Sequence, residues 1–145
     1  MTNQVIDEEV CISAPINIVW DALTNPNITV KYWGNTRIES DWNKGSVIYY
    51  LRNGEIVDEH ELLEIVPHRL IEHTFKPMFG EFKVEPPSLV SIILKEEGLA
   101  TRITLLHRNF PPSSWVYAAC SGGWPKILNS LKVLLESDNY AQQGR

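Results

Sequence analysis

The chain has 145 residues, of which 43% are hydrophobic and 21% are charged, and its formal net charge is −5. These proportions predict a single globular domain, residues 1–145, that is large enough to bury a core. The acidic balance argues against a protein that binds nucleic acid or an anionic membrane surface, because such proteins carry basic patches.

The cysteines and the N-terminal residues give no sign of metal binding, export or membrane insertion. Cys11 and Cys120 lie far apart and lack the CxxC or His-rich spacing of a zinc site, so we expect no disulfide framework, metal or cofactor. Residues 1–9, MTNQVIDEE, contain neither a basic segment nor an apolar run. No apolar stretch approaches the ~18 residues that a membrane span needs. The expected location is therefore the cytoplasm.

A strand and two short helices are predicted for the first part of the chain. Apolar residues alternate along residues 4–12, as in a strand with one buried face. Pro15 suits the first turn of a helix that reaches Leu23. A second helix is expected to begin near Pro26 and to end at Gly34.

From residue 36 onward the pattern changes to strands that are separated by turn residues. Asn53-Gly54 is a strong hairpin signal, and Glu97-Gly98 joins the last two strands. Consecutive strands with short connections are expected to pair antiparallel. The segment 55–66 is long enough to be bent or bulged. The expected strands are 36–42, 46–52, 55–66, 69–76, 88–96 and 99–108.

Residues 77–87 are predicted to form an irregular loop, because the segment begins with Pro77, contains Gly80 and ends with Pro86-Pro87. The loop is either solvated or able to act as a lid. Its Met78-Phe79 pair is the only obvious candidate for an exposed apolar docking site.

One long helix is predicted near the C-terminus. Its segment Ser121–Glu136 has an apolar face at helical spacing, and such a face needs a large partner. The face continues backward through Val116, Tyr117 and Cys120, so we expect one helix that is capped near Ser113 and passes through Pro125. The apolar face consists of Trp124, Ile127, Leu128, Leu131, Leu134 and Leu135. Residues 137–145 are expected to form a frayed tail.

The order of strand, two helices, six strands and a long helix indicates the α+β class. A meander of antiparallel strands has one solvated face and one face that needs cover. The long helix is the only predicted element that is large enough to cover it.

Several short segments carry a family resemblance. They are APINIVWDALT at residues 14–24, Tyr32-Trp33-Gly34, Leu63-Glu64-Ile65-Val66-Pro67 with Leu70, Thr101-Arg102-Ile103-Thr104-Leu105 with His107, and Gly123-Trp124 with Leu128, Leu131 and Lys132. Together they resemble the START-like (SRPBCC) superfamily, in the branch named after the activator of the ninety-kilodalton heat-shock protein ATPase. The resemblance implies a helix-grip fold, in which a curved antiparallel sheet of about seven strands grips the C-terminal helix and leaves a cavity.

One residue departs from the family pattern. His60 stands where the family commonly has glycine, in the strand before Leu63-Glu64-Ile65. We expect this larger, titratable side chain to change either the curvature of the sheet or the lining of the cavity.

The preferred functional hypothesis is binding of a small hydrophobic or amphipathic molecule in that cavity, without catalysis. Aromatic rings supply large contact areas, and Tyr and Trp also carry a polar group that can orient a ligand. For each residue alone, packing in the core is the competing interpretation. The candidate ligand-binding residues are Trp33, Trp42, Tyr49, His60, His73, Phe75, His107, Tyr117, Cys120, Trp124 and Leu128.

Two alternatives stay open. An enzyme of cyclase or hydrolase type would use a cavity histidine or Glu72 as acid or base. No nucleophile with a matched base is visible, so no catalytic residue is assigned, and His107 has the alternative role of a hydrogen bond that steadies the end of the sheet near the helix. The second alternative, implied by the resemblance, is a co-chaperone that docks on a heat-shock chaperone and stimulates its ATPase.

Overall fold

The computed structural model describes residues 4–137 and residue 140. Most of the tail that we expected at 137–145 lies outside the described residues. The strands are β1 (Ile6–Ile12), β2 (Arg37–Ser40), β3 (Val47–Arg52), β4 (Glu55–Val66), β5 (Leu70–Phe75), β6 (Ser88–Glu97) and β7 (Ala100–Arg108). The helices are α1 (Ile16–Thr24), α2 (Pro26–Tyr32), the 3-10 helix η1 (Gly80–Val84) and α3 (Trp115–Leu135).

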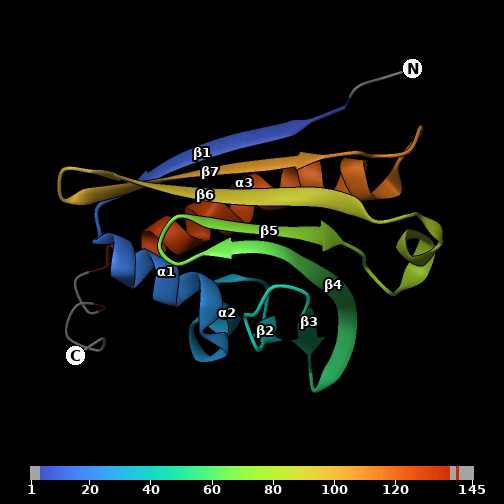
Figure 1. Ribbon diagram of the computed structural model, residues 1–145, viewed down its shortest axis with the longest axis horizontal. Coiled ribbons are helices and arrows are strands. Elements are labelled where there is room, and N and C mark those ends of the chain that lie inside the picture. Colours follow the sequence, from blue (N-terminus) through green and yellow to red (C-terminus); the bar gives the residue numbers. More distant parts are fainter. Residues whose placement is uncertain (1–3, 138–139, 141–145) are drawn as a thin grey trace.

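The seven strands form one antiparallel sheet in the order β1-β7-β6-β5-β4-β3-β2. The first and second strands lie at opposite edges, and α1 and α2 carry the chain from one edge to the other. The sheet curves around α3, which lies along its concave face (Figure 1). The predicted α+β helix-grip fold is therefore confirmed.

The curvature of the sheet is concentrated in β4. The pairing register shifts between Leu62 and Glu64 against β5, and between Tyr50 and Leu51 where β3 meets β4. Bulges of this kind bend a strand and increase its twist. The expected bend of the 55–66 strand is confirmed, and it brings β3 and the start of β4 over α3.

The C-terminal helix is a single element, as predicted, and Pro125 lies inside it. Ser114 caps its first turn, because its side chain accepts a hydrogen bond from the backbone N–H of Tyr117 over 2.9 Å. Its buried residues are Val116, Trp124, Leu128, Leu131 and Leu135. Neither α3 nor any other helix in the described part of the chain has the length and apolar character of a membrane crossing.

The segment 77–87 is more ordered than the sequence suggested, because it contains η1 and is tied down at both ends. The ammonium group of Lys76 donates a hydrogen bond to the carbonyl of Lys83 over 2.6 Å and a second to the carbonyl of Glu85. The carboxylate of Glu85 accepts from the hydroxyl of Ser114 over 2.7 Å and from the backbone N–H of Val116 over 3.2 Å. The segment is therefore attached to the N-terminus of α3.

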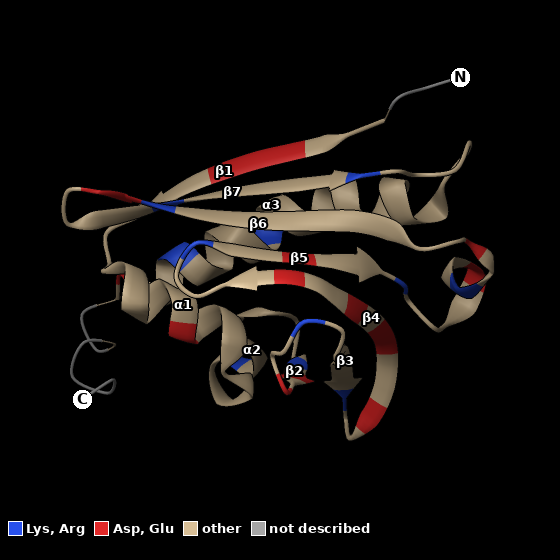
Figure 2. Ribbon diagram, viewed as in Figure 1, with Lys and Arg blue, Asp and Glu red and all other residues tan. Residues whose placement is uncertain are grey.

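Charged side chains are unevenly distributed over the sheet (Figure 2). Acidic residues occupy Asp7, Glu8 and Glu9 in β1 and recur along β4, whereas Lys and Arg are scattered singly. Most of these acidic side chains are exposed or half-buried. Asp58 of β4 is the exception, because it is only 3% exposed.

Candidate functional site

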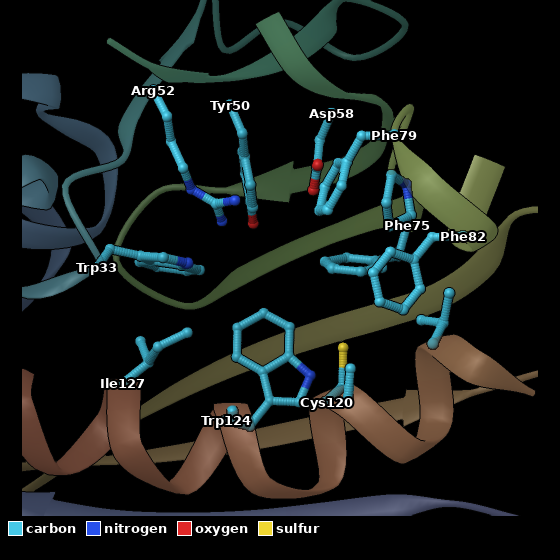
Figure 3. Close-up of a pocket in the computed structure, with 14 residues that line it drawn as sticks. Trp33, Tyr50, Arg52, Asp58, Phe75, Phe79, Phe82, Cys120, Trp124 and Ile127 are labelled. Carbon is cyan, nitrogen blue, oxygen red and sulfur yellow. The ribbon is translucent and has the colours of Figure 1, made fainter.

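A cavity of about 170 Å³ lies between α3 and the concave face of the sheet. An apolar cavity of about 150 Å³ is enough to hold a benzene molecule, so this space can take a ring-sized ligand. Figure 3 shows side chains from the sheet, from α3 and from the 77–87 segment converging on it. The lining residues are Trp33, Tyr50, Arg52, Asp58, Phe75, Pro77, Phe79, Phe82, Val116, Ala119, Cys120, Gly123, Trp124 and Ile127.

Helical spacing builds one wall of the cavity. Cys120, Trp124 and Ile127 lie on consecutive turns of α3 and point toward the sheet (Figure 3). The ring of Trp124 meets Trp33 edge to face with centroids 5.6 Å apart, and it meets Phe75 of β5 at 5.8 Å. Edge-to-face contacts of this kind hold the rings in fixed positions. The apolar walls are therefore preformed.

The sheet side of the cavity carries polar groups. Tyr50, Arg52 and Asp58 come from β3 and β4, and Figure 3 shows their polar ends on the same side of the cavity. The Nε of Arg52 donates to the hydroxyl of Thr36 over 2.9 Å. The Oδ2 atom of Asp58 lies 3.2 Å from Nε2 of His60, but Oδ1 of Asp58 has no hydrogen-bond partner. The cavity thus has aromatic walls and a group of polar side chains on its sheet side.

Two groups in the cavity that could act as nucleophiles stay protonated at neutral pH. Burial, reinforced by the charge of Asp58, raises the pKa of Tyr50 well above its ordinary value. Burial raises the pKa of Cys120 to about 12, with smaller contributions from the charges of Asp58 and Glu85. A thiol with such a pKa supplies almost no thiolate, which is the reactive form.

Three buried histidines lie behind the cavity wall rather than in it. His60 stacks on Phe75 at 4.6 Å, and His107 meets Phe75 at 4.8 Å. Burial, with a smaller contribution from neighbouring His60, lowers the pKa of His73 and of His107 to about 3. Burial also lowers the pKa of His60, although Asp58 opposes this shift. The three imidazoles are therefore neutral at pH 7.

Hydrogen bonds fix the orientation of these histidines. Nδ1 of His107 accepts from the indole N–H of Trp124 over 3.0 Å, and Nε2 of the same ring lies 2.7 Å from the hydroxyl of Ser88. Nδ1 of His60 accepts from the backbone N–H of Lys76 over 2.7 Å. His107 thus makes the hydrogen bond between sheet and helix that the sequence offered as its alternative role. In the described part of the chain, no three His, Cys, Asp or Glu residues are grouped so that they could hold a metal ion.

Comparison with known protein families identifies the family of this chain. The family described as "Activator of Hsp90 ATPase homolog 1-like protein" matches residues 13–136. The chain belongs to this family. It is an AHSA1-like domain of the START-like (SRPBCC) superfamily, as the sequence motifs predicted. A search of curated proteins gives no match.

Several solved structures share the fold. A protein of Mesorhizobium loti is 21% identical, with a TM-score of 0.75, and the match covers 92% of this chain and 97% of that one. The Aha1 dimer of Colwellia psychrerythraea is 23% identical, with a TM-score of 0.74 and coverages of 92% and 96%. An HSP90 activator of Plasmodium falciparum is 19% identical, with a TM-score of 0.74 and coverages of 90% and 95%. At these identities the likeness shows the fold alone.

Some of the predicted site residues line the cavity of this AHSA1-like domain, and others do not. Trp33, Phe75, Cys120 and Trp124 line it. Of the remainder, Trp42 and His73 border a separate void of about 10 Å³. Contact of any of these residues with a ligand stays a prediction.

The other predicted residues lie elsewhere in the fold. Tyr49 lies on the opposite face of β3 from Tyr50, because side chains alternate along a strand, and it borders an open surface groove. Tyr117 packs on Phe110 with ring centroids 5.2 Å apart. Leu128, His60 and His107 are buried in the core around the cavity.

Sequence reasoning missed part of the lining. Asp58 has the same strand parity as His60, which was selected, so alternation along β4 could have identified it. Tyr50 and Arg52 are two residues apart on β3, so the alternation of side chains places them on the same face of the sheet. Phe79 and Phe82 lie in the 77–87 segment, where no periodicity indicates which side chains point inward. The remaining missed residues are Pro77, Val116, Ala119, Gly123 and Ile127.

Proposed function

We propose that this protein binds a small, largely apolar molecule in the cavity between the sheet and α3, and does not convert it chemically. The observation that carries the proposal is a space of about 170 Å³ bounded by aromatic rings. These rings belong to Trp33, Tyr50, Phe75, Phe79, Phe82 and Trp124. Aromatic walls of this kind offer a large apolar contact area at fixed positions.

The size of the cavity limits its ligand. Pockets for drug-sized molecules measure roughly 300–1,000 Å³, whereas this one measures about 170 Å³. The space suits one ring or two fused rings rather than a lipid chain or a polycyclic molecule. We therefore propose a compact ring compound as the ligand.

The chemistry of the surrounding groups supports binding without conversion. The thiol of Cys120, with its pKa raised to about 12 by burial, is a poor nucleophile at neutral pH. The three buried histidines lie behind the wall and are neutral, and His60 and His107 each use Nδ1 to accept a hydrogen bond from the protein. An acid–base catalyst must instead reach the substrate directly or through one water.

A matched pair of helix variants tests the proposal. A Cβ at Gly123 would meet no atom within 4 Å, and Gly123 lines the cavity, so Gly123→Leu places a side chain in the proposed ligand space. Gly122 also has free space, but it is exposed on the same helix, so Gly122→Leu makes the same chemical change outside the cavity.

NMR titration with toluene and indole provides the measurement. We expect both probes to shift the indole N–H signals of Trp33 and Trp124 in the native chain and in Gly122→Leu, and to bind Gly123→Leu at least about tenfold more weakly. Equal binding to the two variants, or no binding of either probe at its solubility limit, would refute the proposal.

A second candidate function rests on an exposed apolar surface at one end of the molecule. Met78, Phe79, Val84 and Trp115 are 44%, 39%, 78% and 58% exposed, and Glu85 connects their segments by accepting a hydrogen bond from the backbone N–H of Trp115. Exposed apolar patches mark docking sites for protein partners, and one structural neighbour is called an HSP90 activator. This alternative predicts stimulation of a chaperone ATPase by the native chain and its loss in Trp115→Ser. An ATPase rate that does not change at saturating protein would exclude it.

A further inference from the structure

We infer that the cavity selects ring molecules that carry an N–H or O–H donor, and that the carboxylate of Asp58 accepts the hydrogen bond from that donor. The inference rests on the proposed function and adds the chemical class of the ligand. Its starting point is a buried carboxylate in the cavity wall that the protein itself leaves short of hydrogen bonds.

The Asp58 side chain is 4% exposed. Its Oδ1 atom and Nε2 of His60 are both buried without a hydrogen-bond partner, and Oδ2 lies 3.2 Å from that Nε2 without forming a hydrogen bond to it. Burying a carboxylate is unfavourable unless hydrogen-bond donors replace the water that is lost. The Oδ1 atom of Asp58, which has no partner within the described chain, therefore calls for a donor from a ligand.

The other buried carboxylate among the described residues shows the contrast. Glu85 accepts from the hydroxyl of Ser114 and from the backbone N–H groups of Trp115 and Val116, so all its contacts are internal and structural. Asp58 has no comparable set of hydrogen-bond donors among the described residues. A carboxylate that serves only the fold would be expected to resemble Glu85.

Neighbouring cations do not supply the missing donor. Among the described residues no ion pair joins Asp58 to Arg52, whose guanidinium lies over the ring of Phe79 at 6.0 Å and donates from Nε to Thr36. The ammonium group of Lys76 is directed to the backbone carbonyls of Lys83 and Glu85. Asp58 lines the cavity, so a donor on a bound ligand can approach its carboxylate.

The negative charge of Asp58 affects groups on both sides of the cavity. It contributes to raising the pKa of Tyr50 on the sheet and of Cys120 on α3, after the larger effect of burial. The same field opposes an anionic group close to Asp58 and favours a donor or a cation.

An isosteric pair of ligands tests the inference. Indole and benzofuran have nearly the same size and shape, but only indole carries an N–H donor. In NMR titrations of the native chain we expect indole to bind at least about tenfold more tightly than benzofuran, because only indole pairs with the buried acceptor. We expect the difference to vanish in Asp58→Leu and to persist in Glu59→Leu, which removes the same charge from the exposed face of β4.

A second measurement uses the native chain alone, so it does not depend on whether the variants fold. The N–H proton of bound indole is expected to move downfield and to show a nuclear Overhauser effect to the Hβ protons of Asp58. Equal affinities of the native chain for the two ligands, or tighter binding of benzofuran, would overturn the inference while leaving ring binding in place. If neither ligand binds, both the inference and the proposed function fail.

Discussion

The indole N–H of Trp124 in α3 donates a hydrogen bond to Nδ1 of His107 in β7, over 3.0 Å. Both side chains are buried, at 2% and 0% exposure, so this bond joins the helix to the sheet in the absence of solvent. An indole can only donate, so Nδ1 of His107 must be unprotonated. The contact that positions Trp124 at the cavity therefore also sets the tautomer of His107.

The three buried histidines are predicted to adopt two different tautomers. His60 and His107 carry their proton on Nε2, because Nδ1 accepts from Lys76 or from Trp124. His73 carries its proton on Nδ1, which donates to the carbonyl of Thr74 over 2.6 Å. Long-range ¹H–¹⁵N correlation spectra distinguish the tautomers. A proton on Nδ1 of His107 would contradict the hydrogen bond with Trp124.

Stability is predicted to fall as the pH falls below about 6.5. His73 and His107 have pKa values of about 3 in the folded protein, because burial disfavours their charged forms, against 6.5 for the free side chain. Below pH 6.5 the unfolded chain therefore binds more protons than the folded protein. The stability that comes from keeping these two histidines neutral is lost progressively down to about pH 3.

The pH dependence can be assigned with variants. The free energy of unfolding is measured by chemical denaturation between pH 7 and pH 5. As the pH falls, it should decrease less steeply for His73→Asn than for the native chain, by up to about 1.4 kcal/mol per pH unit. The surface variant His68→Gln serves as a control, because that side chain is exposed at the turn before β5. Identical slopes for the native chain and His73→Asn would contradict this assignment.

The inner face of α3 is predicted to contribute much of the stability of the fold. Leu131 is 0% exposed, so Leu131→Ala should lower the free energy of unfolding by about 2–5 kcal/mol. Val133 on the same helix is 64% exposed, and Val133→Ala should change the free energy by less than about 0.5 kcal/mol. Urea denaturation measures both. A loss below about 0.5 kcal/mol for Leu131→Ala would contradict the helix placement.

Glu85 is predicted to stabilise the start of α3. Its carboxylate accepts hydrogen bonds from the first turn of the helix, where negative charge is favourable. Glu85→Gln removes that charge and should cost about 1–2 kcal/mol. Glu81→Gln, an exposed change in η1, is the control. Hydrogen exchange at the amides of Trp115 and Val116 should accelerate in the first variant alone, and equal exchange in both would be the contrary result.

The order and type of the regular elements could be predicted because they depend on local patterns. Alternation along β1 and β4 and the helical spacing of Trp124, Leu128 and Leu131 are independent of distant contacts. Order in the 77–87 segment could not be predicted, because η1 depends on Glu85 reaching the end of α3, which is distant in the sequence. The family motifs supplied the arrangement of sheet and helix.

The candidate site was harder to predict than the fold. Of the aromatic candidates, Trp33, Phe75 and Trp124 line the cavity, whereas Tyr49 lies on the opposite face of β3. Applying strand parity to polar residues would have added Asp58. No sequence pattern shows that a carboxylate lacks hydrogen-bond partners, because this property depends on donors from several elements.

The position of a bound ring molecule tests the central claim most directly. A crystal structure of the protein with indole should show the ligand in the cavity, bounded by Trp33, Phe75 and Trp124, with its nitrogen directed to the carboxylate of Asp58. Indole found instead on the exposed surface around Met78 and Trp115, or an empty cavity at saturating indole, would contradict the proposed function.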